Sequence, residues 1–127
     1  MWTVGNKKRI LIVDDEPGIL KVLAIQLTHD GYDVITTTTG EEAIDLVREK
    51  NPDVVLLDIL MPGVTGLEVL DKVRAFSQVP VIVFTANPRV VAEAMEMGAN
   101  GSIPKPFNPD ELKEKIEAAL ADIKGRP

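Results

Sequence analysis

Short apolar runs alternate with segments of helical periodicity along most of the chain, and no other feature constrains the fold as strongly. The runs at 10–13, 54–57 and 81–84 are apolar at consecutive positions, which is typical of strands buried on both faces. Residues 17–30 instead carry apolar side chains three and four positions apart, which is typical of a helix with one buried face. Because parallel strands are joined by crossover helices, this alternation predicts an α/β protein.

The alternation continues through five strand–helix units. The predicted strands cover 9–14, 34–38, 53–58, 79–85 and 101–103, and the predicted helices cover 17–30, 40–50, 66–76, 89–97 and 108–123. Right-handed crossovers place helices on both faces of such a sheet. We therefore predict a flavodoxin-like (βα)5 fold, a doubly wound parallel sheet with the strand order 2-1-3-4-5. Pro104, after the last strand, would remove a hydrogen-bond donor, which an edge strand tolerates.

The 127 residues correspond to one domain, which we place at 8–123 between an N-terminal tail (1–7) and a C-terminal tail (124–127). The first residues lack the apolar stretch of a secretion signal. No apolar run approaches the ~20 residues that a helix needs to cross a bilayer. These features predict a cytoplasmic protein that does not enter a membrane.

Composition excludes several kinds of chemistry. The chain has no cysteine, which excludes thiol catalysis, thiolate metal sites and disulfides. Its one histidine, His29, lies near the polar end of a predicted helix, where we expect it to be exposed to solvent. The net charge of −6 argues against direct binding to nucleic acid. Carboxylates, hydroxyls, lysines and a bound cation remain as candidates for chemistry.

Polar residues stand at the carboxyl ends of four predicted strands. The first strand ends at Asp14 and is followed by Asp15, and the third ends in Asp58. The fourth ends in Thr85, and Lys105 comes shortly after the fifth. In the order 2-1-3-4-5 these strands lie side by side, and ligands of such sheets bind beyond the carboxyl ends. We therefore expect all five side chains to converge at one rim of the sheet.

Three neighbouring carboxylates repel one another unless a cation lies among them. Oxygen ligands with space for water suit Mg²⁺, and a lysine beside them suits an anion such as a phosphoryl group. A positioned carboxylate could attack that group while the hydroxyl of Thr85 hydrogen-bonds to it. Taken singly, the same residues have plainer interpretations. Acids at strand ends often cap helices, as Asp15 could, and Lys105 could be an ordinary surface lysine.

These residues together resemble the receiver domain of two-component response regulators of the chemotaxis-regulator type. The resemblance covers nearly the whole chain and rests on five blocks that occur in order. The blocks are residues 10–16 (ILIVDDE), 52–63 (PDVVLLDILMPG), 81–86 (VIVFTA), 98–99 (GA) and 105–107 (KPF). The resemblance implies a signalling domain, not an enzyme, that binds Mg²⁺, accepts a phosphoryl group and then changes its binding to partners.

The resemblance also assigns roles at the rim. Asp58 matches the aspartate that takes a phosphoryl group from the phosphohistidine of a sensor histidine kinase or a histidine phosphotransfer protein. Asp15 matches a direct ligand of Mg²⁺, and Asp14 matches an acid that reaches the metal through water. The remaining matches are the metal-binding backbone carbonyl of Leu60, the switch hydroxyl of Thr85, the phosphate-binding Lys105 and a Lys105–Pro106 bond that is commonly cis.

Two features depart from the family pattern. Receivers usually have Tyr or Phe three residues before the lysine, where this chain has Ser102. The stretch between Thr85 and Gly98 is about two residues shorter than in typical receivers. We therefore predict an ordinary phosphorylation site beside an unusual surface for a downstream protein target. By the same resemblance, Leu60 and Asn87 flank the path of attack and affect the lifetime of the phosphoryl group.

Two other functions compete with this one. A phosphatase of the haloacid dehalogenase type also forms an aspartyl phosphate, but it has a second aspartate where this chain has Leu60. A pseudo-receiver would bind partners without phosphorylation and would not require the acids, Thr85 and Lys105 together. The sequence also leaves open whether the chain acts alone or as the receiver part of a longer regulator.

Overall fold

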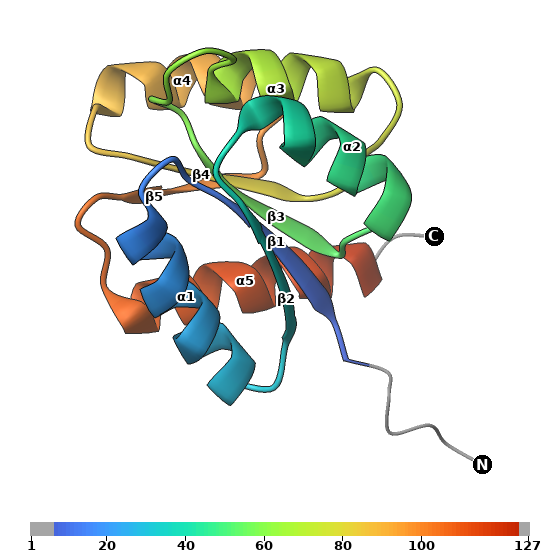
Figure 1. Cartoon of the computed structure of the whole chain (residues 1–127), viewed down its shortest axis with the longest axis vertical. Coiled ribbons are helices and arrows are strands. Elements are labelled where there is room, and N and C mark those ends of the chain that lie inside the picture. The colour runs from blue at the N-terminus through green and yellow to red at the C-terminus, as the bar shows by residue number, and fades with distance from the viewer. Residues whose placement is uncertain (1–6, 125–127) are drawn as a thin grey trace.

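Five strands and five helices alternate along residues 7–124, the part of the chain that the structure, a computed structural model, describes; side chains are described to residue 121 (Figure 1). Almost all of the two predicted tails falls outside this range. The elements are β1 (Arg9–Val13), α1 (Pro17–His29), β2 (Asp33–Thr37), α2 (Gly40–Lys50), β3 (Val54–Asp58), α3 (Gly66–Arg74), β4 (Val81–Thr85), α4 (Pro88–Glu96), β5 (Gly101–Pro104) and α5 (Pro109–Lys124).

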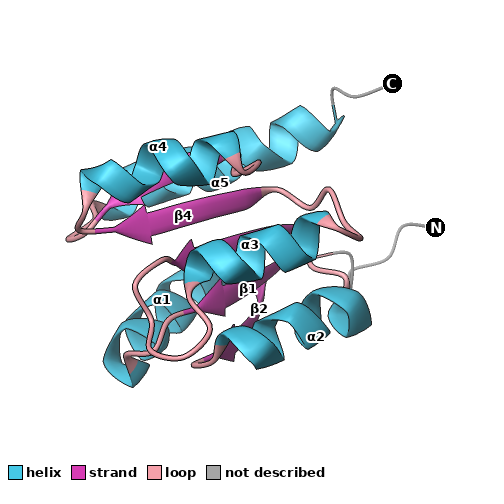
Figure 2. Cartoon of the chain, turned by 90° about the horizontal axis from the view of Figure 1, so that it is seen from above, coloured by secondary structure: helices cyan, strands magenta, loops and turns pink. Residues whose placement is uncertain are grey.

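The strands form one parallel sheet in the order β2-β1-β3-β4-β5, which confirms the predicted topology. Helices α2, α3 and α4 cover one face, and α1 and α5 cover the other (Figure 1). All strands point the same way, so their carboxyl ends share one edge, which lies at the left in Figure 2. The strand order reverses at this edge between β1 and β3, which is where ligands of such sheets bind.

Alternate residues of each strand enter different cores. In β1, Leu11 and Val13 pack under α2 and α3, while Ile10 and Ile12 pack under α1 and α5. All four side chains are fully buried. This two-sided burial is the physical reason why the central strands read as continuous apolar runs instead of an alternating pattern.

The predicted element boundaries are correct to within two residues. Strand β4 begins at Val81 instead of position 79, because Pro80 has no N–H to donate to a ladder. Pro104 is the last residue of β5, which is an edge strand as predicted, and it pairs in register with Thr85. His29 is exposed near the end of α1, and the Lys105–Pro106 bond is cis, as the resemblance implied.

Helix α3 begins against the backbone of β3. The N–H of Gly66 donates to the carbonyl of Ile59 at 2.9 Å. A Cβ atom on Gly66 would lie 2.2 Å from the carbonyl oxygen of Asp58, so only glycine permits this approach. Thr65 and Glu68 form a capping box that satisfies the first turn of the helix. The close packing holds the end of β3, and with it Asp58, in one position.

None of the helices in the described part of the chain combines the length and the apolar character needed to cross a membrane.

Candidate functional site

The three acids predicted at the rim lie together. Asp14 follows β1, Asp58 ends β3, and the two strands are neighbours in the sheet. Carboxylate oxygens of Asp14, Asp15 and Asp58 all lie within 4.8 Å of one another. Asp14 and Asp58 are buried, and Asp15 is half-buried. The order of the strands therefore brings the acids together, as the sequence predicted.

Lys105 reaches into the cluster from the loop after β5. Its Nζ lies 2.9 Å from Oδ2 of Asp14 and 3.4 Å from Oδ2 of Asp58. Its backbone N–H donates to the carbonyl of Thr85 at 3.1 Å, which ties the loop to the end of β4. Only 18% of the side chain is exposed. Lys105 is therefore a partner of the acids and not a solvated surface lysine.

Asp14 has a donor at each carboxylate oxygen. Oδ1 accepts the N–H of Glu16 at 2.8 Å, and Oδ2 accepts Lys105. The N-cap of α1 is Glu16, whose side chain makes no capping hydrogen bond, so the alternative that Asp15 caps this helix is wrong. Asp15 is the most exposed of the three acids, so its carboxylate is the most accessible to a ligand.

The balance of charge makes Asp58 unusual. Burial and, next, the charge of Asp14 raise its pKa from 3.8 to about 6, although Lys105 and the Leu60 N–H lower it in part. Burial also disfavours the charged form of Lys105, but its hydrogen bond to Asp14 and the nearby carboxylates outweigh this and raise its pKa. Three carboxylates therefore face one ammonium group, and the excess negative charge suits a divalent cation.

Thr85 ends β4, one position beyond Phe84, which pairs in register with Asp58. The Thr85 side chain is buried, and its Oγ1 accepts the N–H of Asn87 at 3.1 Å. Leu60 lies two positions after Asp58, in the loop after β3, and the residue is 56% exposed. The structure thus places the predicted hydroxyl at the end of β4 and the predicted backbone ligand in the loop after β3, at the same rim.

The donor set fits Mg²⁺. It consists of hard carboxylate oxygens that lie close enough together to share one cation. Such oxygens, with a partly exposed acid that leaves room for water, are what Mg²⁺ prefers in proteins. The described residues supply no nitrogen or sulfur ligand to this cluster, so a softer transition metal has less reason to bind there.

The side of the molecule near Ser102 is open. A groove of about 360 Å³ is lined by Thr85, Ala86, Pro88, Val91, Ser102 and Pro104. None of these lining residues is aromatic, so among the described residues no ring from elsewhere takes the place of the one that receivers usually have at position 102. Where the family usually has an aromatic ring, this chain therefore has Ser102 and an open groove.

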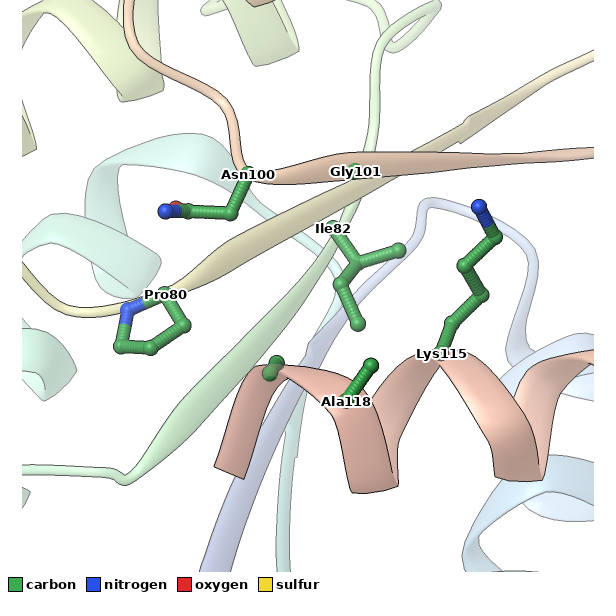
Figure 3. A pocket seen from close by; sticks show the side chains of 7 residues that line it. Pro80, Ile82, Asn100, Gly101, Lys115 and Ala118 are labelled. Carbon is green, nitrogen blue, oxygen red and sulfur yellow. The ribbon is translucent and has the colours of Figure 1, made fainter. Parts of the chain in front are cut away.

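A second cavity lies away from the rim, by the amino-terminal ends of β4 and β5. Its volume is about 310 Å³, and Pro80, Ile82, Asn100, Gly101, Lys115, Ala118 and Ala119 line it (Figure 3). Asn100 uses Oδ1 to accept the N–H of Val81 and an N–H of Arg74, a purely structural role. None of the predicted site residues lines this cavity.

One residue near the site was not predicted. The ring of Phe84 lies under Lys105, with Nζ 4.9 Å from the ring centroid. The sequence shows Phe84 only as one member of an apolar strand, and no motif distinguishes it from a core residue. Its contact depends on the path of a lysine that lies 21 residues farther along the chain.

Comparison with protein families and curated sequences gives a consistent result. Residues 10–117 match the model of the response regulator receiver domain. The chain is 44% identical over 117 residues to the "Probable transcriptional regulator ycf27" of Guillardia theta, covering 91% of this chain and 46% of that protein. It is 38% identical to the DNA-binding response regulator MtrA of Mycolicibacterium smegmatis, covering 95% and 54%. The chain thus spans about half the length of these curated relatives.

Solved structures show the same fold. A CheY-like response regulator receiver domain protein from Methanospirillum hungatei superimposes with a TM-score of 0.87 at 32% identity, covering 92% of this chain and 96% of that one. The chemotaxis protein CheY4 of Vibrio cholerae, solved at low pH, has a TM-score of 0.84 at 33% identity, covering 90% and 99%. The chain therefore belongs to the response regulator receiver domains of two-component signalling.

Proposed function

We propose that this domain accepts a phosphoryl group on Asp58, in a reaction that depends on Mg²⁺, and that the modification changes its binding to a partner protein. The observation that carries the proposal is the buried carboxylate of Asp58, held 3.4 Å from the ammonium group of Lys105 and beside two further acids. An acid that only ends a strand at the protein surface would not require a buried lysine and two further carboxylates beside it. The combination is suited to holding an anion against a nucleophile.

The chemistry assigns Asp58 as the nucleophile. One of its oxygen atoms forms the new O–P bond as the P–N bond of a phosphohistidine breaks, and the departing imidazole nitrogen keeps the electron pair. Asp58 must be ionised for this step. Its pKa of about 6 leaves it mostly ionised at neutral pH, and a neighbouring divalent cation would favour that form further.

Mg²⁺ would be held by Asp15, Asp58 and the backbone carbonyl of Leu60, with Asp14 acting through water. Both oxygens of Asp14 already accept a hydrogen bond, which favours this indirect role. When bound, the ion would screen the negative charge of the arriving phosphoryl group. Without it, three carboxylates would repel that group.

Lys105 and Thr85 then bind the new phosphoryl oxygens. Lys105 already contacts Asp58, so its ammonium group needs only a small movement to follow the negative charge outward. The buried hydroxyl of Thr85 accepts the N–H of Asn87 and can still donate its own proton. A shift of Thr85 toward the phosphoryl group would disturb the start of α4, which Asn87 caps, and so alter the surface there.

We propose that the phosphoryl donor is a sensor histidine kinase or a histidine phosphotransfer protein, which docks on the face of α1. Val22 and Ile25 expose 61% and 63% of their surfaces there. A groove of about 610 Å³ runs from this helix to the loop after β5 and reaches Lys105; it is lined by Ile19, Val22, Gln26, Ala86, Lys105, Pro106, Phe107 and Pro109. An apolar surface that borders the reactive group suits a protein donor.

The output is the binding of a downstream partner protein. MtrA is a DNA-binding response regulator, but this chain matches only about half of it. We propose that the receiver domain, which carries a net charge of −6, makes no direct contact with nucleic acid and lies in the cytoplasm, and that residues 8–123 form the unit. It is a phosphoryl acceptor and not an enzyme with a separate substrate.

Intact-mass spectrometry tests the proposal. The protein is incubated with Mg²⁺ and phosphoramidate, a small donor with a P–N bond, and we expect one added phosphoryl group. The adduct should be absent in Asp58→Asn and should disappear when EDTA removes the metal. Asp53→Asn is the matched control, because Asp53 lies before the opposite end of β3 and accepts the N–H of Arg9. No adduct, or one that survives Asp58→Asn, would favour the pseudo-receiver.

A further inference from the structure

The ammonium group of Lys105 has a defined set of neighbours. An ammonium group has three N–H donors and no acceptor. Carboxylate oxygens of Asp14 and Asp58 lie 2.9 and 3.4 Å from Nζ. Nζ also lies over the ring of Phe84, 4.9 Å from its centroid, inside the range of a cation–π contact. With 18% of the side chain exposed, little of this environment is water.

Phe84 is itself held firmly. Its residue is only 3% exposed, and it packs in the core under α1 and α5. With Leu23, Leu56, Ile103, Phe107 and Leu112, it surrounds a gap of only about 10 Å³, too small to let the ring turn freely. Its strand neighbours in register are Asp58 and Ile103. The ring therefore presents a fixed surface next to the acid cluster.

A fixed ring matters because a lysine side chain is flexible. Four rotatable bonds let Nζ swing into solvent, and each retained contact limits that freedom. The two carboxylates hold the ammonium group at 2.9 and 3.4 Å, and the ring adds a third contact. A ring face attracts a cation without requiring one hydrogen-bond direction, so it restrains Lys105 in addition to the two carboxylates.

We infer that Phe84 is a positioning residue for the phosphorylation reaction, because its ring holds the ammonium group of Lys105 toward Asp58. The inference rests on the proposed function of Asp58. As the phosphoryl group joins Asp58, the ammonium group must move from the carboxylate to a phosphoryl oxygen. Its contact with the ring requires no fixed direction and survives this short movement, so Lys105 keeps the ring contact in both states.

An aliphatic residue of similar size would fill the same core space. It would not attract the ammonium group, because the attraction comes from the negative potential of the ring face. A merely structural role for Phe84 and a positioning role therefore make different predictions. The first depends on volume alone, and the second depends on the electron density of the ring.

Fluorinated phenylalanines separate these two roles. Replacing Phe84 by mono-, di- and trifluorophenylalanine lowers the electron density of the ring in steps and changes its volume little. We expect the initial rate of phosphorylation by phosphoramidate, at saturating Mg²⁺, to fall in proportion with each step. The trifluoro variant and Phe84→Leu should both be slowed about fivefold, which corresponds to ~1 kcal/mol, the upper value for a cation–π contact that water still reaches. Thermal unfolding should change little across the fluorinated series.

The same series at Phe76 is the matched control. The guanidinium carbon of Arg48 lies 4.3 Å from the centroid of the Phe76 ring, beyond the end of α3 that is far from the rim, so this series reports the effect of fluorine on a cation–π contact that the reaction does not use. Rates that stay constant along the Phe76 series and fall along the Phe84 series support the positioning role. Equal rates along the Phe84 series overturn the positioning role. If the wild-type protein is still phosphorylated on Asp58, the proposed function stands.

A second measurement does not depend on phosphorylation. In the unmodified protein, the ring current of Phe84 should shift the proton resonances of the Lys105 ε-methylene upfield, and Phe84→Leu should remove the shift. Its absence from the wild-type spectrum contradicts the inference. A wild-type protein that shows the shift but forms no adduct on Asp58 contradicts the proposed function and leaves the contact itself established.

Discussion

The rim between β1 and β3 and the side formed by α4 and β5 are built in opposite ways. At the rim, both oxygens of Asp14 have donors, and Lys105 joins two buried acids. On the other side, Ala94 is the only fully buried residue of α4, and a groove of about 360 Å³ separates Ser102 from the helix that faces it. At the rim, ion pairs and hydrogen bonds fix the positions of the side chains. Beside α4 and β5, the groove leaves space that no side chain fills.

The difference has an electrostatic cause. A buried charge must have a partner, so the residues of the rim constrain one another and leave little freedom for change. A half-buried apolar helix requires only that some apolar surface be covered, and many arrangements satisfy this. The departures from the family pattern fall where the physical constraints are weakest, and four predictions test this contrast.

Two glycine substitutions give the largest expected difference. Gly66→Ala places a Cβ 2.2 Å from the Asp58 carbonyl oxygen, so β3 and α3 must separate. We expect a loss of more than ~3 kcal/mol in the free energy of unfolding, together with loss of phosphorylation. Gly101→Ala in β5 meets no atom within 4 Å and should stay within ~0.5 kcal/mol of wild type. Urea unfolding measures both, and a similar cost at the two positions would contradict the contrast.

Lys105→Met should have the next largest effect. It leaves the buried carboxylates of Asp14 and Asp58 without their cation, and we expect a loss of about 2–3 kcal/mol at pH 7.5 without divalent metal. Phosphorylation should fall strongly, since no ammonium group remains to bind the phosphoryl oxygen. Lys113→Met, at an exposed position of α5, is the control and should change stability by less than ~0.5 kcal/mol. Equal unfolding curves for the two variants would mean that the rim tolerates an unpaired acid.

The pH dependence of stability should carry the signature of Asp58. Its folded-state pKa is about 6 against 3.8 for the unpaired group, so the folded state binds this proton more tightly than the unfolded state. Its contribution to stability is therefore present below pH 3.8 and is lost as the pH rises toward 6. Lys105 has a raised pKa and contributes throughout this window, up to its ordinary value of 10.5.

We therefore expect metal-free wild type to lose about 2 kcal/mol relative to Asp58→Asn between pH 4 and pH 7.5. Mg²⁺ should restore stability to the wild type at pH 7.5 and much less at pH 4. Urea unfolding at several pH values, with EDTA or Mg²⁺, measures this difference. A difference between the two proteins that stays constant with pH would show that Asp58 titrates normally.

Ser102→Phe should have the smallest effect. The groove beside Ser102 has room for a ring, so we expect unfolding free energy to change by less than ~1 kcal/mol and phosphorylation by less than about twofold. Thermal unfolding and the intact-mass assay measure the two quantities, with Ser102→Ala as the control. A large loss of phosphorylation in Ser102→Phe alone would show that the open side and the rim are tightly coupled.

The fold and the composition of the site could be predicted because both depend on short-range patterns and general rules. Apolar runs locate the central strands, and the handedness of crossovers then limits their order. Once the order is known, Asp14, Asp58 and Thr85 must lie at the same rim, since each ends or directly follows a strand of the same parallel sheet. The errors at element ends were small; β4, for example, begins after Pro80 because proline cannot join the ladder.

Three details of the site could not be predicted. The sequence allowed Asp15 to cap α1, but the cap is Glu16. Lys105 is separated from Asp14 by 91 positions, and no local pattern states which acid it approaches more closely. The open groove at Ser102 depends on how α4, with Pro88 and Val91, is positioned relative to β5. Each depends on side-chain rotamers and helix placement that only the packed molecule determines.

The sequence by itself determined that five strands and five helices form one doubly wound sheet and that three acids, a hydroxyl and a lysine meet at its rim. The alternation of apolar runs and the rules for parallel sheets suffice for this. The tertiary structure decided how these groups are paired, how burial raises the pKa of Asp58, and that Phe84 lies under Lys105. Electrostatic interactions depend on distances of a few ångströms, and only the complete packing of the core sets distances on that scale.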